Sequence, residues 1–411
     1  MNAREAIGPE EALRLRRRDF DRLRSWMLGA ATLLLGLGVV LVYSASAIRA
    51  ERYGSSLYFL ERQLTWMGVG LAAFFLLSRV DYRRLASLRW VLLGAALGLL
   101  GAVLFFGPRI NGARRWLRWG AYSLQPSEAA KVLMVVVMAA FLARLEGRVR
   151  SSLGRFLAVA SLALAAAALI AVEPDIGTAL LVAVVLLAML VAGGARIRHI
   201  FVLLLLAGPP AAYLLATHFS HIMGRIHAWI EGGTSGKAYH AYMSLQSLGS
   251  GGLFGMGPGA GWAKLYYLPE AHTDFIFAMA GQEFGLVCSL GILTAFAVFV
   301  GCGARLSRLA PDAFGSHLAF GLTLMIGLQA ALHVAVVTAA VPTKGISLPF
   351  VSFGGSGLVC SLAALGILAS IARHAWRPEP GYPAAQNEPA DWRATLFARP
   401  LFPHSEGSQR V

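Results

Sequence analysis

Three ionisable side chains lie within five residues at the start of an apolar stretch. The segment YLPEAHTDFIFA, residues 267–278, contains Glu270, His272 and Asp274. Carboxylates at such a position can serve in proton transfer, because burial raises the pKa of a carboxyl group. The simpler alternative is that Thr273 or Asp274 caps the helix that follows. His272 has no Cys or His partner at ligand spacing, so the sequence gives little support for a metal site.

A second polar cluster opens another apolar stretch. In QPSEAAK, residues 125–131, Glu128 and Lys131 are three residues apart, so they share one helix face and can form an ion pair. Charged side chains inside a membrane span are costly, and those that occur often have a function. The pair therefore either shapes a polar cavity or contacts a ligand.

Two further clusters lie between apolar stretches. EPDIGT, residues 173–178, contains Glu173 and Asp175, which either serve a tight turn and a helix cap or contact a ligand. PTKGISLPFVSFGGSG, residues 342–357, contains Lys344 together with two serines. Ser352 and Ser356 either cap the last helix or hydrogen-bond a ligand.

The composition indicates a membrane protein. The chain is 57% hydrophobic and only 14% charged, well below the roughly 25% charged residues typical of soluble domains. We predict an all-α polytopic membrane protein with about ten transmembrane helices, the first of them a span and not a cleavable signal. The predicted spans are 26–48, 64–79, 88–107, 128–144, 156–173, 175–193, 199–217, 274–301, 315–341 and 355–373.

The distribution of arginines predicts the orientation. Arginines crowd residues 1–25 and every second loop, so both termini are expected on the cytoplasmic side. The predicted organisation is a basic cytoplasmic segment (1–25), a membrane domain (26–373) with a large extracytoplasmic loop (218–273), and a flexible cytoplasmic tail (374–411). The same rule explains the net charge of +15 without a nucleic-acid partner.

One predicted outer segment departs from this rule. Residues 108–127 carry Arg109, Arg114, Arg115 and Arg118. They either pair with lipid headgroups or form an anion site, since a guanidinium binds phosphate in a bidentate manner. Taken together, the outer clusters supply cations for phosphate, carboxylates for proton transfer and an apolar body for a lipid tail. The residues alone predict an enzyme or a carrier that acts on a polyprenyl-phosphate-type lipid.

Six segments carry a resemblance to a known family. They are YSASA (43–47), GARRW with QPSEAAK (112–131), EPDIGTA (173–179), LQSLGSGGLFGMGPG (245–259), LPEAHTDFIFA (268–278) and PTKGISLPFVSFGGSGL (342–358). In this order they resemble the SEDS proteins (shape, elongation, division, sporulation), and LPEAHTDFIFA and PTKG resemble the FtsW branch more than the RodA branch. Phe353, Gly357 and Gln282 stand where the family usually has Tyr, Ser and Glu.

The resemblance implies a peptidoglycan glycosyltransferase. Such proteins polymerise lipid II, an undecaprenyl-pyrophosphate disaccharide-pentapeptide, at the outer face of the cytoplasmic (inner) membrane. They act with a class B penicillin-binding protein and, in the FtsW branch, with other membrane proteins of cell division. The essential acid of the HTDF motif corresponds to Asp274.

The mechanistic hypothesis makes Asp274 the general base in an inverting transfer. The expected substrate-binding residues are Arg109, Arg114, Arg115, Gln125, Ser127, Glu128, Lys131, Glu173, Asp175, Glu270, His272, Lys344, Ser352 and Ser356. No cofactor is required by the sequence, although Glu173 and Asp175 leave open a divalent cation on the pyrophosphate. The alternatives are a lipid II flippase, an elongation polymerase of the RodA type, and a scaffold for the penicillin-binding protein.

Overall fold

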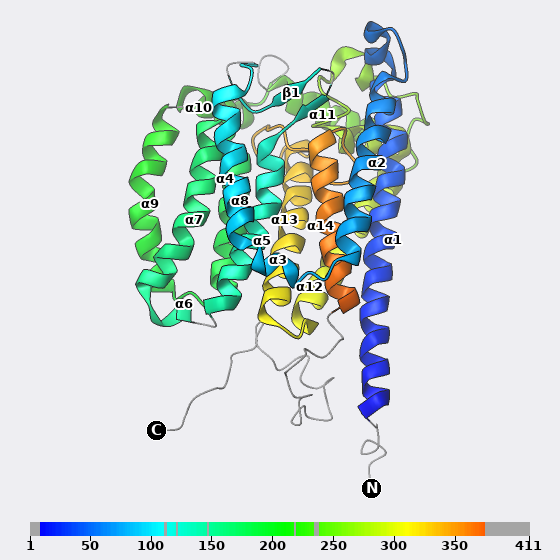
Figure 1. Ribbon diagram of the computed structural model, residues 1–411. Helices are drawn as coiled ribbons and strands as arrows, with labels where there is room; N and C mark the ends of the chain where they lie inside the picture. The colour runs from blue at the N-terminus through cyan, green and yellow to red at the C-terminus, as the bar shows by residue number, and fades with distance from the viewer. Residues whose placement is uncertain are drawn as a thin grey trace, which may run out of the picture.

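Long helices standing side by side form the body of the protein (Figure 1). The computed structural model describes residues 9–110, 113–120, 122–145, 148–217, 219–233 and 238–374. Within them the long helices are α1 (Pro9–Ala50), α2 (Tyr58–Arg79), α4 (Arg89–Phe106), α5 (Pro126–Leu145), α7 (Leu153–Val172), α8 (Ile176–Ala192), α9 (Ile197–Thr217), α12 (Ile276–Leu309), α13 (Ala313–Val337) and α14 (Gly355–His374). The predicted helical fold is confirmed, with one of these helices at each predicted span.

The helices have the length and composition of membrane spans. Among the described residues, six of them, α1, α4, α7, α12, α13 and α14, are long and apolar enough to cross a membrane. Two more, α8 and the first part of α9, are apolar but shorter. The chain is therefore a multi-pass membrane protein. Residues 1–8 and 375–411 lie outside the described residues, so the proposed boundaries of the terminal segments stay predictions.

The two ends of the bundle differ. One end carries a short antiparallel hairpin of β1 (Leu117–Trp119) and β2 (Tyr122–Leu124), which adds to the predicted all-α fold; we call it the hairpin end. It also carries α10 (Phe219–Glu231), α11 (Tyr239–Ser250) and the single turns η1 (Glu51–Tyr53) and η2 (Ala263–Tyr267). At the opposite end α1 begins, α14 ends, and α3 (Arg84–Ser87) and α6 (Arg148–Ser151) join longer helices (Figure 1).

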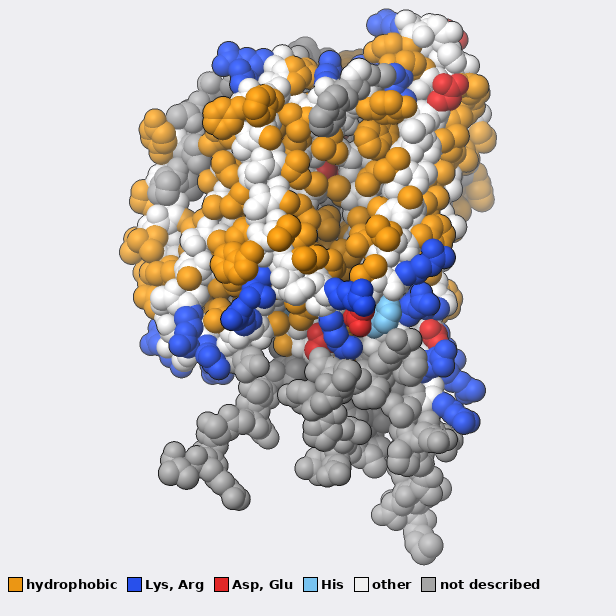
Figure 2. All heavy atoms as spheres, in the orientation of Figure 1, with side chains coloured by type: hydrophobic (Ala, Val, Ile, Leu, Met, Phe, Trp, Pro, Cys, Tyr) orange, Lys and Arg blue, Asp and Glu red, His pale blue; other side chains and the backbone are white. Residues whose placement is uncertain are grey.

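The surface follows the same division. Figure 2 shows apolar side chains over the lateral surface and a concentration of Lys and Arg side chains at the opposite end. That is the distribution expected where a bundle meets the cytoplasmic face of a membrane. Figure 2 also shows a hollow in the lateral surface between α4 and α2, with an acidic side chain visible in its depth.

The charged helix α5 lies in the middle of the bundle. It packs against α4, α7, α8, α13 and α14. Most of its residues are buried, including Glu128 and Lys131 in its first turns. Because protein surrounds α5 on most sides, Glu128 and Lys131 face other helices and not lipid, which removes the main cost of placing them in a membrane.

Helix α12 is interrupted near the hairpin end. Gly285 has φ 75° and ψ −169°, which breaks the ladder of helical hydrogen bonds. The glycine-rich turn after α11 replaces the lost partners: Met256 N donates to Gln282 O at 2.9 Å, and Leu286 N donates to Gly252 O at 3.0 Å. A Cβ on Gly255 would lie 2.2 Å from Glu283 O, so only glycine permits this approach.

Candidate active site

Asp274 lies at the hairpin end, directly before α12. Its backbone N–H donates to Glu270 O at 3.0 Å, which closes a turn. The N-cap of α12 is Phe275, with no side-chain cap, and Thr273 Oγ1 donates to Glu270 O. The alternative that Thr273 or Asp274 caps this helix is therefore wrong. Within the described residues no hydrogen bond is made to the Asp274 carboxylate, so the carboxylate is left for other chemistry.

The surroundings of Asp274 favour a base near neutral pH. Its side chain is only partly exposed. Burial, followed by the charge of Glu270, raises the pKa of Asp274 to about 7. A carboxylate with that pKa is a far better proton acceptor than one near its ordinary value of about 4.

The segment between α13 and α14 lies against Asp274. Gly345 lies directly beside the Asp274 carboxylate, because a Cβ added to this glycine would be 2.6 Å from Asp274 Oδ2. Ser352 ties the two segments together: its Oγ donates to Thr273 O at 2.6 Å and accepts from Leu348 N at 2.8 Å. Ser352 thus holds the loop in place and does not cap α14.

Two residues of α13 hold the same loop from its other side. Gln329 Nε2 donates to Ser347 O at 2.9 Å, and His333 Nδ1 lies 2.6 Å from Ile346 O. Both were missed in the sequence analysis. The available signal was their i, i+4 spacing, which places two polar side chains on one face of an apolar span.

Glu270 and His272 support the turn that carries Asp274. Glu270 forms an ion pair with Arg49 of α1 at 2.8 Å, and both side chains are partly exposed. The His272 ring packs between Phe59 and Phe353, with centroid distances of 4.8 and 5.6 Å. Burial lowers the pKa of His272 to about 4, so the ring is neutral at physiological pH. These contacts make His272 a packing residue in this conformation.

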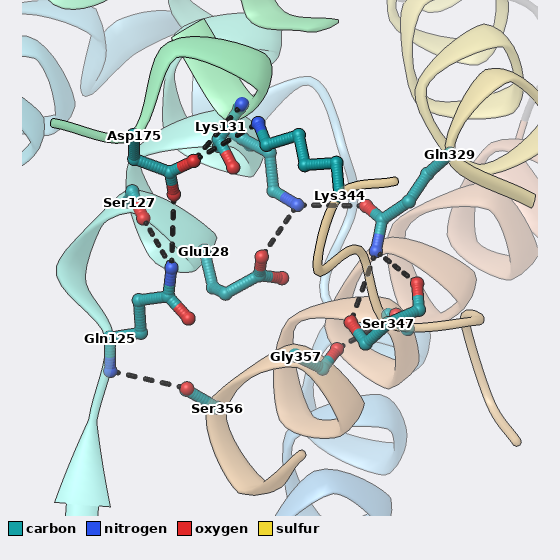
Figure 3. Close-up of polar contacts among 12 residues, drawn as sticks. Gln125, Ser127, Glu128, Lys131, Asp175, Gln329, Lys344, Ser347, Ser356 and Gly357 are labelled. Carbon is teal, nitrogen blue, oxygen red and sulfur yellow. Dashed lines mark hydrogen bonds and ion pairs between the residues drawn. The ribbon is translucent and has the colours of Figure 1, made fainter. Parts of the chain in front are cut away.

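Glu128 and Lys131 form the predicted ion pair (Figure 3). Lys131 Nζ donates to Glu128 Oε1 at 2.8 Å and to Gln329 Oε1 at 2.8 Å, so α5 and α13 share one network. Gln329 therefore links Lys131 to the loop beside Asp274. A Cβ on Gly357 would lie 3.2 Å from Glu128 Oε2, which puts the start of α14 against this carboxylate.

Gln125, Ser127 and Ser356 continue this network toward the hairpin end (Figure 3). Gln125 Nε2 donates to Ser127 Oγ at 3.1 Å and to Asp175 Oδ2 at 3.4 Å. Ser356 Oγ accepts from Gln125 N at 3.2 Å, so this serine joins α14 to the start of α5.

The turn between α7 and α8 gathers two carboxylates and a cation. Asp175 caps α8 by accepting from Thr178 N at 3.3 Å, as the capping alternative predicted. It also pairs with Lys344, at 3.2 Å. Burial raises the pKa of Asp175, but the charges of Lys344 and Arg115 outweigh it, and the net pKa is lowered.

Lys344 and Glu173 each keep unused hydrogen-bonding capacity. Lys344 Nζ makes no hydrogen bond of good geometry, and both Glu173 carboxylate oxygens are buried without a partner among the described residues. Burial, followed by the charge of Asp175, raises the pKa of Glu173 to about 8. Buried polar atoms without partners are uncommon, and they mark positions where an unseen ligand or water fits.

The arginines of the outer segment have different surroundings. Arg115 donates to the carbonyls of Glu173, at 3.1 Å, and Pro174, so it stabilises the turn between α7 and α8. Arg114 Nη1 donates to Leu104 O at 2.6 Å at the end of α4, and its Nε is buried without a partner among the described residues. Arg109 is exposed. Gly112 of the GARRW motif lies outside the described residues.

No metal centre is evident in the described part of the chain. It contains no group of three or more His, Cys, Asp or Glu side chains that could hold an ion. Glu173 and Asp175 remain a pair of carboxylates near one cation, and a divalent ion on a bound pyrophosphate stays a prediction.

Fold and site together define a polytopic membrane protein with a half-buried carboxylate at one end of the bundle and a buried polar network beneath it. A family model described as "Cell cycle protein", covering FtsW, RodA and SpoVE, matches residues 24–377. The chain belongs to this family, as the motifs predicted.

Named relatives agree. Stage V sporulation protein E of Bacillus subtilis is 37% identical over 347 residues, 83% of this chain and 94% of that protein. A probable peptidoglycan glycosyltransferase FtsW of Trichlorobacter lovleyi is 37% identical over 358 residues, 86% of this chain and 93% of that protein. The predicted likeness to FtsW is thereby confirmed.

Two solved structures show the same fold. The rod shape determining protein RodA of Thermus thermophilus has a TM-score of 0.64 and 28% identity, covering 86% of this chain and 97% of that one. A chain in a study of how a peptidoglycan synthase complex coordinates polymerization and crosslinking has a TM-score of 0.68 and 26% identity, covering 84% and 96%.

Proposed function

We propose that this protein is a peptidoglycan glycosyltransferase that polymerises lipid II for septal wall synthesis at the outer face of the cytoplasmic membrane. The observation that carries the proposal is the position of the Asp274 carboxylate directly beside Gly345, in the loop that also carries the cation Lys344. The loop that lies beside the proposed base therefore also carries a cation, Lys344, whose ammonium pairs with Asp175. The names of the FtsW relatives supply the reaction class.

Asp274 acts as the general base. It accepts the proton of the acceptor sugar's 4-hydroxyl while that oxygen forms a bond to the anomeric carbon of the donor. The bond from this carbon to the pyrophosphate oxygen breaks, and the leaving group keeps the electron pair. A single displacement inverts the anomeric centre. The raised pKa of Asp274 suits this role, because proton transfer is most effective when the catalytic pKa lies near the working pH.

Lys344 stabilises the charge that develops on the pyrophosphate. Its ammonium has donors left over after the ion pair with Asp175. A cation positioned before the reaction begins lowers the barrier more than one that must be rearranged. Arg115 contributes indirectly, because it holds the turn that carries Asp175. Glu128, Lys131 and Gln329 keep the neighbouring loop in place and line the polar interior.

The lateral hollow between α4 and α2 gives a lipid substrate a route from the membrane (Figure 2). An acidic side chain in its depth shows that the hollow reaches polar groups. A lipid whose tail stays in the membrane can bring its polar head to the hairpin end by this route. In this proposal the hairpin end lies on the outer face and the arginine-rich end in the cytoplasm, the orientation that the charge rule favours.

The proposed partner is a class B penicillin-binding protein, which crosslinks the strands that this protein makes. The support is the structural likeness to a chain from a complex that coordinates polymerization and crosslinking. If a new glycan strand is to reach the transpeptidase without first diffusing away, the polymerase and the transpeptidase must bind each other.

The test is polymerisation of lipid II by the purified protein in detergent, with and without the cognate transpeptidase. Detergent removes the second leaflet, so product formation supports the enzyme and excludes transport as the sole activity. The isosteric Asp274→Asn variant, which keeps the turn, should lose polymerisation by at least about 100-fold, the lower range for a general base. Wild-type glycan synthesis by this variant would overturn the role of Asp274, and lipid movement without any product would favour a flippase.

A further inference from the structure

A groove lies between α1 and α12 at the opposite end of the bundle, far from Asp274 along both helices. Its volume is about 480 Å³, and its lining includes Arg22, Leu23 and Trp26 of α1 and Val298, Gly301 and Arg305 of α12. None of these residues takes part in the site described above. The groove therefore calls for its own explanation.

Two unpaired cations flank the groove from different helices. Arg22 and Arg305 are both exposed, and within the described residues neither forms an ion pair. The nearby Asp21 already contacts Arg17 and Arg24, at 3.8 and 3.4 Å. Two arginines without carboxylate partners on either side of an opening present a concentrated positive charge to an anion.

One carboxylate also lines the groove. Asp19 precedes Arg22 by three residues on α1, so it lies about 4.5 Å further from the membrane along the helix axis, at 1.5 Å per residue. With one carboxylate against two guanidinium groups, the lining of the groove carries a net positive charge.

The inner part of the groove is apolar. Leu23 and Val298 form its walls, and Trp26 is 61% exposed at the position where the apolar stretch of α1 begins. Tryptophan at this depth is typical of the membrane interface. A Cβ on Gly301 would meet no atom within 4 Å, so the α12 wall leaves open space there. The groove thus joins a cationic mouth to an apolar wall at the level where the apolar stretch of α1 begins.

We propose that the α1–α12 groove binds one phospholipid with an anionic headgroup. The headgroup phosphate lies between Arg22 and Arg305, and an acyl chain runs past Leu23, Trp26 and Val298 into the space beside Gly301. Bound in this way, the lipid joins α1 to α12 at the end where the two helices leave the membrane. The proposal does not depend on the proposed catalytic function.

The experiment measures lipid retained by the full chain. Purified, delipidated protein is incubated with dioleoyl phosphatidylglycerol or dioleoyl phosphatidylcholine, and bound lipid is counted by native mass spectrometry. The double variant Arg22→Gln, Arg305→Gln should bind phosphatidylglycerol about tenfold or more weakly than wild type. The matched control Arg18→Gln, Arg308→Gln removes the same charge from exposed positions on the same helices and should bind as wild type does.

A second variant tests the apolar part without changing charge. Gly301→Leu fills the open space and should reduce phosphatidylglycerol binding, whereas Gly291→Leu fills equally open space on α12 outside the groove and should not. Equal retention of both lipids, or equal retention by groove and control variants, would overturn the proposal. Displacement of the lipid by millimolar inorganic phosphate would reduce the groove to a simple anion site and overturn it as well.

Discussion

Gly345 stands so close to Asp274 that a Cβ added to it would lie 2.6 Å from Oδ2 of the carboxylate. No real Cβ is found at that distance, so a side chain here must push the carboxylate away. Gln329 and His333 hold the neighbouring carbonyls, and the loop therefore has little freedom to retreat. The present position of the proposed base therefore requires that residue 345 have no side chain.

Gly345→Ala should reduce polymerisation by about 100-fold, because a displacement of about 1 Å of a reacting group has that effect. The folded protein should persist, since the clash is with one side chain at the surface of the site. The rate of glycan synthesis from lipid II measures the effect. The control is Gly354→Ala in the same loop, where the nearest atom to the new Cβ is 3.9 Å away. Equal activity of the two variants would contradict this account.

The activity should rise with pH through about 7. Asp274 accepts a proton only when ionised, and burial, followed by Glu270, raises its pKa to about 7. Glu270→Gln removes the negative charge that contributes to the raised pKa of Asp274, so the rise in activity should move to lower pH. Burial of Asp274 remains, so its pKa should stay above the ordinary value for Asp. Arg49→Gln breaks the same ion pair but keeps the negative charge of Glu270, and should not move the rise in activity to lower pH. The measurement is the pH dependence of kcat/KM for the wild type and for the two variants.

Lys131→Met should destabilise the fold by about 3–5 kcal/mol, the usual effect of removing one partner from a buried pair. The side chains of Lys131 and Glu128 are 5% and 12% exposed, so Glu128 would be left as a buried, unpaired charge. Adding Glu128→Gln should restore part of the loss. Thermal unfolding in detergent, evaluated as a double-mutant cycle, separates the pair's own contribution. Additive effects of the two substitutions would show that the pair is not coupled.

Stability should depend on pH through Glu173. Its pKa is raised in the folded protein, to about 8, so the folded state binds the proton more tightly than the unfolded state. This contribution is fully present below the unfolded value near 4.5 and is lost as the pH rises toward 8. Glu173→Gln, which mimics the protonated form, should flatten the fall in melting temperature between pH 5 and 8. If the melting temperature of the variant fell with pH as steeply as that of the wild type, the titration of Glu173 would not contribute to the pH dependence of stability.

Much of the fold follows from the sequence. Apolar runs predict the long helices because each must satisfy its backbone hydrogen bonds internally within lipid. The pairing of Glu128 with Lys131 follows from their spacing, and the cap made by Asp175 follows from its place before α8. Local periodicity and helix-end chemistry suffice for such features, because the residues involved are neighbours along the chain.

The contacts that set the proposed site join distant segments, and only the tertiary structure decided them. No local pattern predicts that Gly345 lies beside Asp274, that Gln329 joins Lys131 to the same loop, or that Arg115 stabilises the turn of Glu173 instead of facing the solvent. The β1–β2 hairpin and the break at Gly285 likewise depend on partners elsewhere in the chain. The sequence by itself determined which helices form and which charged residues enter the membrane, since both depend on local propensity and the cost of burial. Which of these charges stand together was decided by helix packing, because it depends on how α5, α12, α13 and α14 meet at the hairpin end.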